Sequence, residues 1–205
     1  MYKVFYNQRK VFFINRDKDL IDGDKSLKHY FTNRELLKGI LEIFSTDESI
    51  KNLYIFCKDI ESTFKIFSGL FEIIEAAGGL VKNENNQFLA IFRREKWDLP
   101  KGKLEKDEAP EQGAVREVQE ECGIEEIQLL NHITTTYHTY NLNHQMILKK
   151  TYWYKMFYSG QDKLKPQTEE DITEVKWLDY SDIPMVINNT FPSIIEVLKA
   201  GEIIK

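Results

Sequence analysis

The sequence predicts an α/β protein in two parts, a small α/β domain at residues 1–70 and a larger α/β sandwich at residues 71–205. Segments with helical spacing of apolar residues alternate along the chain with short segments rich in β-branched and aromatic residues. The pattern of residues changes near Phe71, after which longer strand-like segments and a glutamate-rich helix follow. Helices interleaved with strands of mixed length are typical of an α/β sandwich.

The first part contains a hairpin, a loop and two capped helices. Lys3–Tyr6 and Val11–Ile14 flank a polar tetrapeptide and predict a β-hairpin, and polar residues 15–28 predict a loop. Asn33 and Asp59 are good N-caps for the two helices. The apolar helix positions are Leu36, Leu37, Ile40, Leu41 and Phe44, then Phe64, Ile66 and Phe67, with a strand at Leu53–Cys57 between the helices.

The second part alternates strands with two helices. Asn83–Asn86 is a turn by composition, a glutamate-rich helix runs between Pro110 and Gly123, and a last helix begins near Pro192 and ends at Gly201. The predicted strands are Phe71–Glu75, Gly79–Lys82, Phe88–Phe92, Ile127–Thr136, Leu148–Tyr158 and Glu174–Leu178.

Composition excludes several classes of protein. A net charge of −5 argues against a protein that binds the nucleic-acid backbone, where a basic surface supplies most of the affinity. No apolar run is long enough to cross a bilayer, and the N-terminus becomes polar too early for a signal peptide. The two cysteines, Cys57 and Cys122, lack the spacing of a metal site and predict reduced thiols. We therefore expect a cytoplasmic protein.

The glutamate-rich helix carries the chemistry. Glu117, Glu120 and Glu121 stand at i, i+3 and i+4, so they share one helix face. Like charges at this spacing repel each other, and a hard divalent cation would turn that repulsion into attraction. Oxygen ligands alone suit Mg²⁺ or Mn²⁺. The alternative is a solvated acidic helix without a ligand. Gly113 inside this helix predicts a close approach of another backbone.

The wider pattern around this helix resembles the Nudix box. It consists of Gly102, Glu108, Arg116-Glu117, Glu120-Glu121 and Gly123, with an apolar residue at the defining positions. The lead-in, which includes Trp97-Asp98-Leu99-Pro100-Lys101-Gly102, also looks like that of the family. The resemblance covers residues 71–178.

Membership of the Nudix family implies an α/β/α sandwich with a mixed sheet, in which the box forms a loop–helix–loop. It implies hydrolysis of a nucleoside diphosphate linked to another group. By position, Glu117, Glu120, Glu121 and the Gly102 carbonyl would bind Mg²⁺, and Glu108 would support the loop or hold a water molecule outside the ligands of the metal. Glu117 or Glu120 could act as the base, and the sequence does not separate the base from the ligands.

Family enzymes also use an acidic residue outside the box. Glu174, three residues before Trp177, is the favoured candidate, and Glu170 is the second. For each, a solvated surface charge is the alternative.

Substrate phosphates need cations, and four basic residues flank the box: Arg93, Arg94, Lys101 and Lys103. Five residues on the following strand pair, which could stack on a base or pack in the core, are His138, Tyr140, Lys150, Tyr152 and Tyr154. Leu-Pro-Lys-Gly is similar to the box entrance of diadenosine and diphosphoinositol polyphosphate hydrolases, which favours a dinucleoside polyphosphate. ADP-ribose or another nucleotide diphosphate derivative is the alternative substrate.

A different class of function is a non-catalytic nucleotide sensor or interaction protein on the same fold, to which the additional N-terminal part lends weight. The retention of every box carboxylate favours an enzyme. As partners we expect a small nucleotide or polyphosphate, no membrane and no stably bound nucleic acid. The sequence does not decide whether the protein forms a homodimer.

Overall fold

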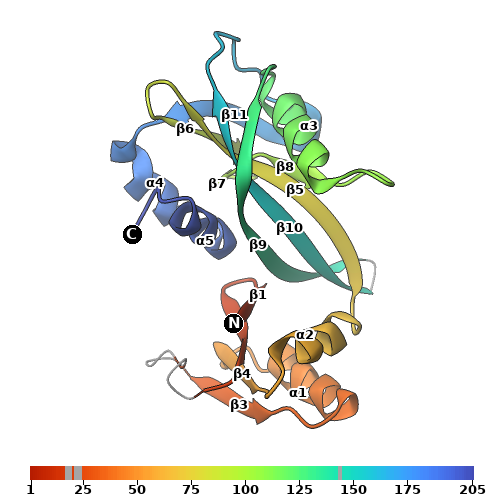
Figure 1. The fold of residues 1–205 in the computed structure, drawn as a ribbon. Helices are drawn as coiled ribbons and strands as arrows, with labels where there is room; N and C mark the ends of the chain where they lie inside the picture. Colours follow the sequence, from red (N-terminus) through yellow and green to blue (C-terminus); the bar gives the residue numbers. More distant parts are fainter. Residues whose placement is uncertain (17–19, 21–24, 143–144) are drawn as a thin grey trace. The chain divides into compact units, whose positions relative to one another are not determined.

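The computed structural model describes residues 1–16, 20, 25–142 and 145–205 (Figure 1). The chain forms two compact units. Unit 1 contains Met1–Ile74 and Tyr137–Lys149, and unit 2 contains Glu75–Thr136 and Lys150–Lys205. Unit 1 includes Tyr137–Lys149 because the long strands β9 (Gln128–Leu142) and β10 (Gln145–Tyr158) each contribute residues to both units.

Unit 1 contains the predicted hairpin. Strands β1 (Tyr2–Tyr6) and β2 (Arg9–Ile14) pair antiparallel around Asn7, whose positive φ of 54° suits the turn. Strand β2 then pairs in parallel with β4 (Asn52–Phe56), which pairs in parallel with β3 (Ser26–Tyr30).

Strand β3 corrects the sequence prediction of a loop through residue 28. Its residues alternate between exposed and half-buried, and Ser26 and Lys28 are polar. Such a segment has little strand character by itself, and pairing with β4 makes it a strand. Residues 17–19 and 21–24 of the predicted loop lie outside the described part of the chain.

The two helices of unit 1 begin where their caps predict. The Asn33 side chain accepts a hydrogen bond from the backbone of Leu36 at the start of α1 (Arg34–Thr46), and Asp59 does the same for Ser62 at the start of α2 (Ile60–Ser68). The α1 side chains that reach the core are Leu37, Leu41 and Phe44. Leu36, also predicted on the apolar face, is 55% exposed.

The sheet of unit 2 has the strand order β11-β6-β5-β10-β9. Strand β5 (Glu72–Asn83) is one continuous strand where the sequence predicts two. The small residues at its centre belong to the strand because β8 (Lys101–Lys103) lies against them, and a side chain at Gly78 would meet the Pro100 carbonyl at 2.4 Å. Antiparallel partners of β6 (Phe88–Arg93) are β7 (Lys96–Asp98) and β11 (Ile172–Leu178).

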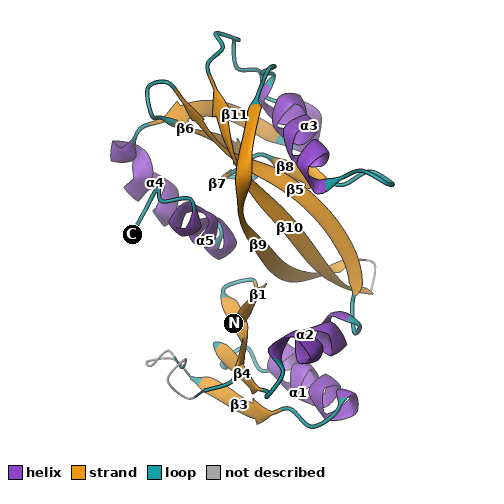
Figure 2. Cartoon of the chain, in the orientation of Figure 1, coloured by secondary structure: helices purple, strands orange, loops and turns teal. Residues whose placement is uncertain are grey.

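Helices cover both faces of this sheet, as Figures 1 and 2 show. Helix α3 (Pro110–Cys122) packs Ala114 and Val118 against one face. On the other face α4 (Ile183–Asn188) and α5 (Pro192–Ala200) pack against Leu80 and Trp153. This confirms the predicted α/β/α sandwich with a mixed sheet, to which α4 adds a helix that the sequence did not predict. Among the described residues, no helix is long and apolar enough to span a membrane.

Candidate active site

Helix α3 presents the box carboxylates from a firmly packed position. It begins at Pro110 without a side-chain cap at Ala109 and ends at Gly123, whose φ of 68° is left-handed. Glu117 and Glu121 are buried, at 7% and 0% exposure, whereas Glu120 faces solvent. The three glutamates therefore share a helix face but differ strongly in their access to water.

Gly113 is required by side chains rather than by backbone. A β-carbon there would stand 2.4 Å from Leu104 Cδ2 and 2.9 Å from Glu108 Oε2. The sequence prediction of a close backbone approach was wrong in this respect. The loop before α3 folds its own side chains over the helix, and glycine makes room for them.

Arg116 holds three box glutamates at once. Its Nε and Nη2 donate to the two carboxylate oxygens of Glu108 at 2.7 and 2.8 Å, and its Nη1 donates to Glu117 at 2.8 Å and to Glu120 at 3.0 Å. Hydrogen bonds from Arg116 lower the pKa of Glu108 to about 2. Glu108 also accepts a bond from the backbone N–H of Glu105, so it supports the loop as predicted.

Glu117 lies directly against the Gly102 backbone. A β-carbon on Gly102 would stand 1.9 Å from Glu117 Oε2 and 2.1 Å from its carboxylate carbon. Burial raises the pKa of Glu117, and Arg116 opposes that effect. Nearby Glu120 and Glu170 raise the Glu117 pKa further, because an additional negative charge is unfavourable there.

Glu121 joins the helix to two strands. Its Oε2 accepts a hydrogen bond from the Lys101 backbone at 2.8 Å, and its Oε1 lies 3.6 Å from Arg93 Nη1. Within the described residues this Oε1 is buried and has no hydrogen-bond partner. Burial raises the pKa of Glu121 to about 7, although Lys101 and Arg93 lower it in part.

These groups fit a divalent cation, which the fold family implies. In the described part of the chain, no three acidic side chains lie close enough together to hold an ion as they stand. The donor chemistry is nevertheless suitable: carboxylates from Glu117, Glu120 and Glu121 beside the Gly102 backbone. Glu121 has a buried oxygen without a hydrogen-bond partner, and the buried carboxylate of Glu117 is paired with Arg116.

Of the two acidic candidates outside the box, Glu170 lies nearer to it. Arg93 Nη2 is 3.0 Å from Glu170 Oε2, so Arg93 connects Glu170 to Glu121. Glu174 forms an ion pair with Lys176 of its own strand. The register of β11 shifts between Ile172 and Glu174, at the candidate itself.

The other predicted phosphate-binding residues have different surroundings. The Lys101 ammonium donates to Asp98 Oδ2 at 2.6 Å, in a pair whose side chains are only 15% and 6% exposed. Arg94 pairs with Asp171 at 2.8 Å at the surface. Lys103 is exposed and pairs with β5 through its backbone. Sequence reasoning did not single out Asp98, although a carboxylate three residues before Lys101 is a signal for such a pair.

The five candidates on β9 and β10 do not form one cluster. His138 and Tyr140 belong to unit 1, where their rings stack at 5.5 Å. In unit 2 the side chains of Lys150 and Tyr152 both donate to Glu75 Oε1, at 3.1 and 2.6 Å. Tyr154 is 4% exposed and lies in the core beneath α3, so its ring is not available for stacking on a base.

The fold and the site together define a class of protein. It is an α/β/α sandwich in which a glycine-bearing loop and an acidic helix hold two buried carboxylates, one of them with an oxygen that lacks a hydrogen-bond partner, beside a solvent-facing carboxylate. The family model of the NUDIX domain matches residues 73–199, more than half of the chain. The chain belongs to the Nudix family.

Curated relatives match about a quarter of the chain. An 8-oxo-dGTP diphosphatase from Escherichia coli (strain K12) is 42% identical over 57 residues, which are 25% of this chain and 44% of that protein. One from Proteus vulgaris is 43% identical over 58 residues, 26% of this chain and 52% of that protein. The chain thus spans about half the length of these relatives.

Solved structures are similar at lower identity. A MutT protein from Methanosarcina mazei Go1 is 22% identical with a TM-score of 0.49, over 63% of this chain and 92% of that one. An Ap4A hydrolase from C. elegans, in a binary complex, is 19% identical with a TM-score of 0.48, over 63% of this chain and 95% of that one.

Proposed function

We propose that this chain is a Mg²⁺-dependent hydrolase that cleaves a diphosphate linkage in a nucleoside polyphosphate or a nucleoside diphosphate derivative. The observation that carries the proposal is the pair of buried glutamates, Glu117 and Glu121, whose pKa values are raised by burial beside the Gly102 loop. Buried carboxylates with raised pKa values cluster at functional sites. A divalent cation would supply the positive charge that they lack.

In this proposal Glu117, Glu120, Glu121 and the Gly102 carbonyl hold the ion. When bound, the ion neutralises phosphate oxygens and lowers the pKa of a water molecule. Arg116 must then release Glu117 and Glu120, and it keeps Glu108 through its two other hydrogen bonds. Release costs little at Glu120, because that side chain is 48% exposed.

Water attacks one phosphorus, the bond to the phosphate leaving group breaks, and a carboxylate takes the proton of the water. Among the box glutamates we take Glu120 as the first candidate for this base, because its side chain is 48% exposed and open to a water molecule. Glu117 stays the second candidate from the box. Outside the box, the contact through Arg93 favours Glu170 over Glu174.

Phosphate binding falls most readily to Arg94 and Lys103. The exposed pair between Arg94 and Asp171 is worth at most about 1 kcal/mol, so a phosphate can replace Asp171 at little cost. Arg93 has a charged partner on each side within the site and positions Glu121 and Glu170. Lys101 is held by buried Asp98, which argues against its donating to substrate.

This pairing bears on the class of substrate. The dinucleoside polyphosphate was favoured because Lys101 stands in the Leu-Pro-Lys-Gly entrance, where its cation could bind a longer phosphate chain. Its bond to Asp98 weakens that reason. The named relatives are 8-oxo-dGTP diphosphatases, and their substrate is a nucleoside triphosphate. We therefore propose a nucleoside triphosphate as the first substrate to test, with diadenosine tetraphosphate and ADP-ribose as the competing classes.

The test is turnover of these three substrates by purified protein with Mg²⁺, in H₂¹⁸O to mark the phosphorus that is attacked. We expect Glu120→Gln to lower kcat at least about hundredfold, in the range of a lost general base. Glu170→Gln should lower kcat more than Glu174→Gln. Glu169→Gln, an exposed neighbour, is the matched control and should be near wild type.

Metal-dependent turnover that survives Glu120→Gln unchanged would refute the assignment of this residue. Tight nucleotide binding without turnover of any substrate would refute the hydrolase and favour the nucleotide sensor. The division near residue 70, a cytoplasmic location and a homodimer stay predictions, which limited proteolysis, fractionation and light scattering can test.

A further inference from the structure

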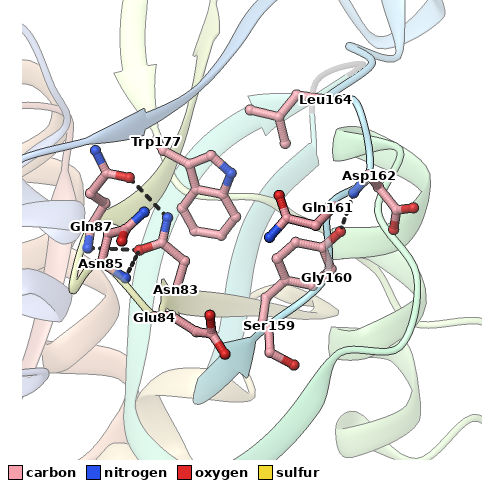
Figure 3. Close-up of a pocket in the computed structure, with 11 residues that line it drawn as sticks. Asn83, Glu84, Asn85, Gln87, Ser159, Gly160, Gln161, Asp162, Leu164 and Trp177 are labelled. Carbon is pink, nitrogen blue, oxygen red and sulfur yellow. Dashed lines mark hydrogen bonds between the residues drawn. The ribbon is translucent and has the colours of Figure 1, made fainter.

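Unit 2 contains a cavity whose lining is separate from the box glutamates. Its volume is about 250 Å³, and it lies between the turn that joins β5 to β6 and the loop that follows β10. Figure 3 shows side chains of the turn on one side and of the loop on the other, with the Trp177 indole between them. The eleven lining residues found in the described part of the chain include none of the box glutamates.

The walls of this cavity are fixed by hydrogen bonds. On the turn, Asn83 Oδ1 accepts from the backbones of Asn85 and Gln87, both at 3.0 Å. On the loop, the Asp162 backbone donates to the Tyr158 hydroxyl at 2.8 Å, and Asp162 Oδ2 accepts from the Glu125 backbone at 2.9 Å. A ligand therefore meets a wall that is already ordered, which lowers the entropic cost of binding.

One face of the cavity is aromatic. The half-buried Trp177 ring stacks on buried Tyr158, with centroids 5.8 Å apart and an angle of 14° between the planes. Tyr158 thus supports one side of the indole, and the indole lines the cavity. Among the aromatic side chains, tryptophan attracts a cation placed over its ring most strongly.

The charge of the lining has one sign. Glu84 and Asp162 are carboxylates, and no lysine, arginine or histidine is among the lining residues of the described chain. Hydrogen bonds lower the pKa of Asp162, so it is ionised at neutral pH. This environment repels the phosphates that the box would attract. It attracts a positive group.

We infer that this cavity binds a small organic cation of the ammonium class, with its charge beside the Trp177 indole and on the side of the cavity that Glu84 lines. The volume matches a single compact group rather than a nucleotide, because pockets for larger ligands occupy roughly 300 to 1,000 Å³. The exposed side chains of Asn85 and Gln161 add polar groups that can bind a hydroxyl on the same ligand. This site is independent of the proposed hydrolase activity.

The experiment is an NMR titration of ¹⁵N-labelled full-length protein with choline, without Mg²⁺, following the Trp177 indole N–H and the Gln161 side-chain amide. We expect saturable shifts confined to the cavity. Dimethylbutanol, which has the shape of choline without its charge, should bind at least about tenfold more weakly. Glucose serves as a neutral polyol.

Two variants test the residues. Trp177→Leu should weaken choline binding about tenfold, and Glu84→Gln, in an exposed turn, about two- to fivefold. Glu202→Gln removes an equal charge elsewhere on the surface of unit 2 and should leave binding unchanged. Because Glu84→Gln changes only an exposed side chain, it keeps the test valid if Trp177→Leu does not fold.

Equal binding of choline and dimethylbutanol, or tighter binding of glucose, would overturn the inference, because charge would then not be what the cavity selects. Absence of saturable shifts would overturn it as well. Loss of hydrolase activity in the assays of the box would leave it intact, because the two sites share no residue.

Discussion

Replacement of Gly102 by alanine tests the geometry of the box most directly. Gly102 has no positive φ, so alanine brings no backbone strain, and its effect comes from the added methyl group alone. That methyl would stand 1.9 Å from Glu117 Oε2. The carboxylate has to retreat by about 1.5 Å to reach an ordinary contact of 3.4 Å. Glu117 is 7% exposed and bonded to Arg116, so it has little room in which to move.

Two magnitudes follow from this clash. Overpacking of a close contact costs about 1 to 3 kcal/mol of stability, which an otherwise stable fold tolerates. A misplacement of about 1 Å at a catalytic group costs on the order of a hundredfold in rate. We therefore expect Gly102→Ala to fold, to lower kcat about hundredfold and to require a higher Mg²⁺ concentration for half-maximal activity.

The assay is initial rate against Mg²⁺ concentration, together with thermal unfolding in the absence of metal. Gly39→Ala is the matched control, because a β-carbon at Gly39 has nothing within 4 Å and lies within α1. It should keep full activity and gain up to about 1 kcal/mol of stability. If Gly102→Ala kept wild-type kcat and Mg²⁺ dependence, the placement of Glu117 against Gly102 would be refuted as the basis of the site.

Three further predictions concern the charged groups of the site. Because burial raises the pKa of Glu121 to about 7, the folded chain binds this proton more tightly than the unfolded chain. The stability that Glu121 contributes without metal is therefore fully present below pH 4.5 and falls by about 3 kcal/mol as pH rises through 7. Chemical denaturation of Glu121→Gln should lack this slope, and an unchanged slope would show that burial of Glu121 is not its cause. Arg116→Lys cannot keep both hydrogen bonds to Glu108, so its free energy of unfolding, measured in urea, should fall by about 1 to 2 kcal/mol. A free energy of unfolding equal to that of the wild type would show that the bidentate contact contributes little. Lys101→Met should lower the melting temperature, because it leaves buried Asp98 without its charged partner. The ratio of kcat/KM for diadenosine tetraphosphate to kcat/KM for a nucleoside triphosphate should stay constant. A selective loss of activity on diadenosine tetraphosphate would show that Lys101 does contact substrate.

Local signals predicted many of the elements. Asn33 and Asp59 mark helix starts because a side-chain oxygen next to the first turn satisfies an unpaired N–H. Pro110 and Gly123 mark the ends of α3 through backbone preferences that act within a few residues. By contrast, the polar strand β3 and the single long strand β5 depend on partners far away in the sequence.

The sequence by itself determined that Glu117, Glu120 and Glu121 share a helix face, because spacing along a helix fixes direction. It also determined the family, because the box is a continuous pattern of short spacings. Only the tertiary structure decided that Glu121 is buried against Lys101, that Lys101 is held by Asp98, and that Arg93 brings Glu170 toward the box. Burial and the choice of a charged partner depend on which strands meet, and that is set by the packing of the whole sheet rather than by neighbouring residues.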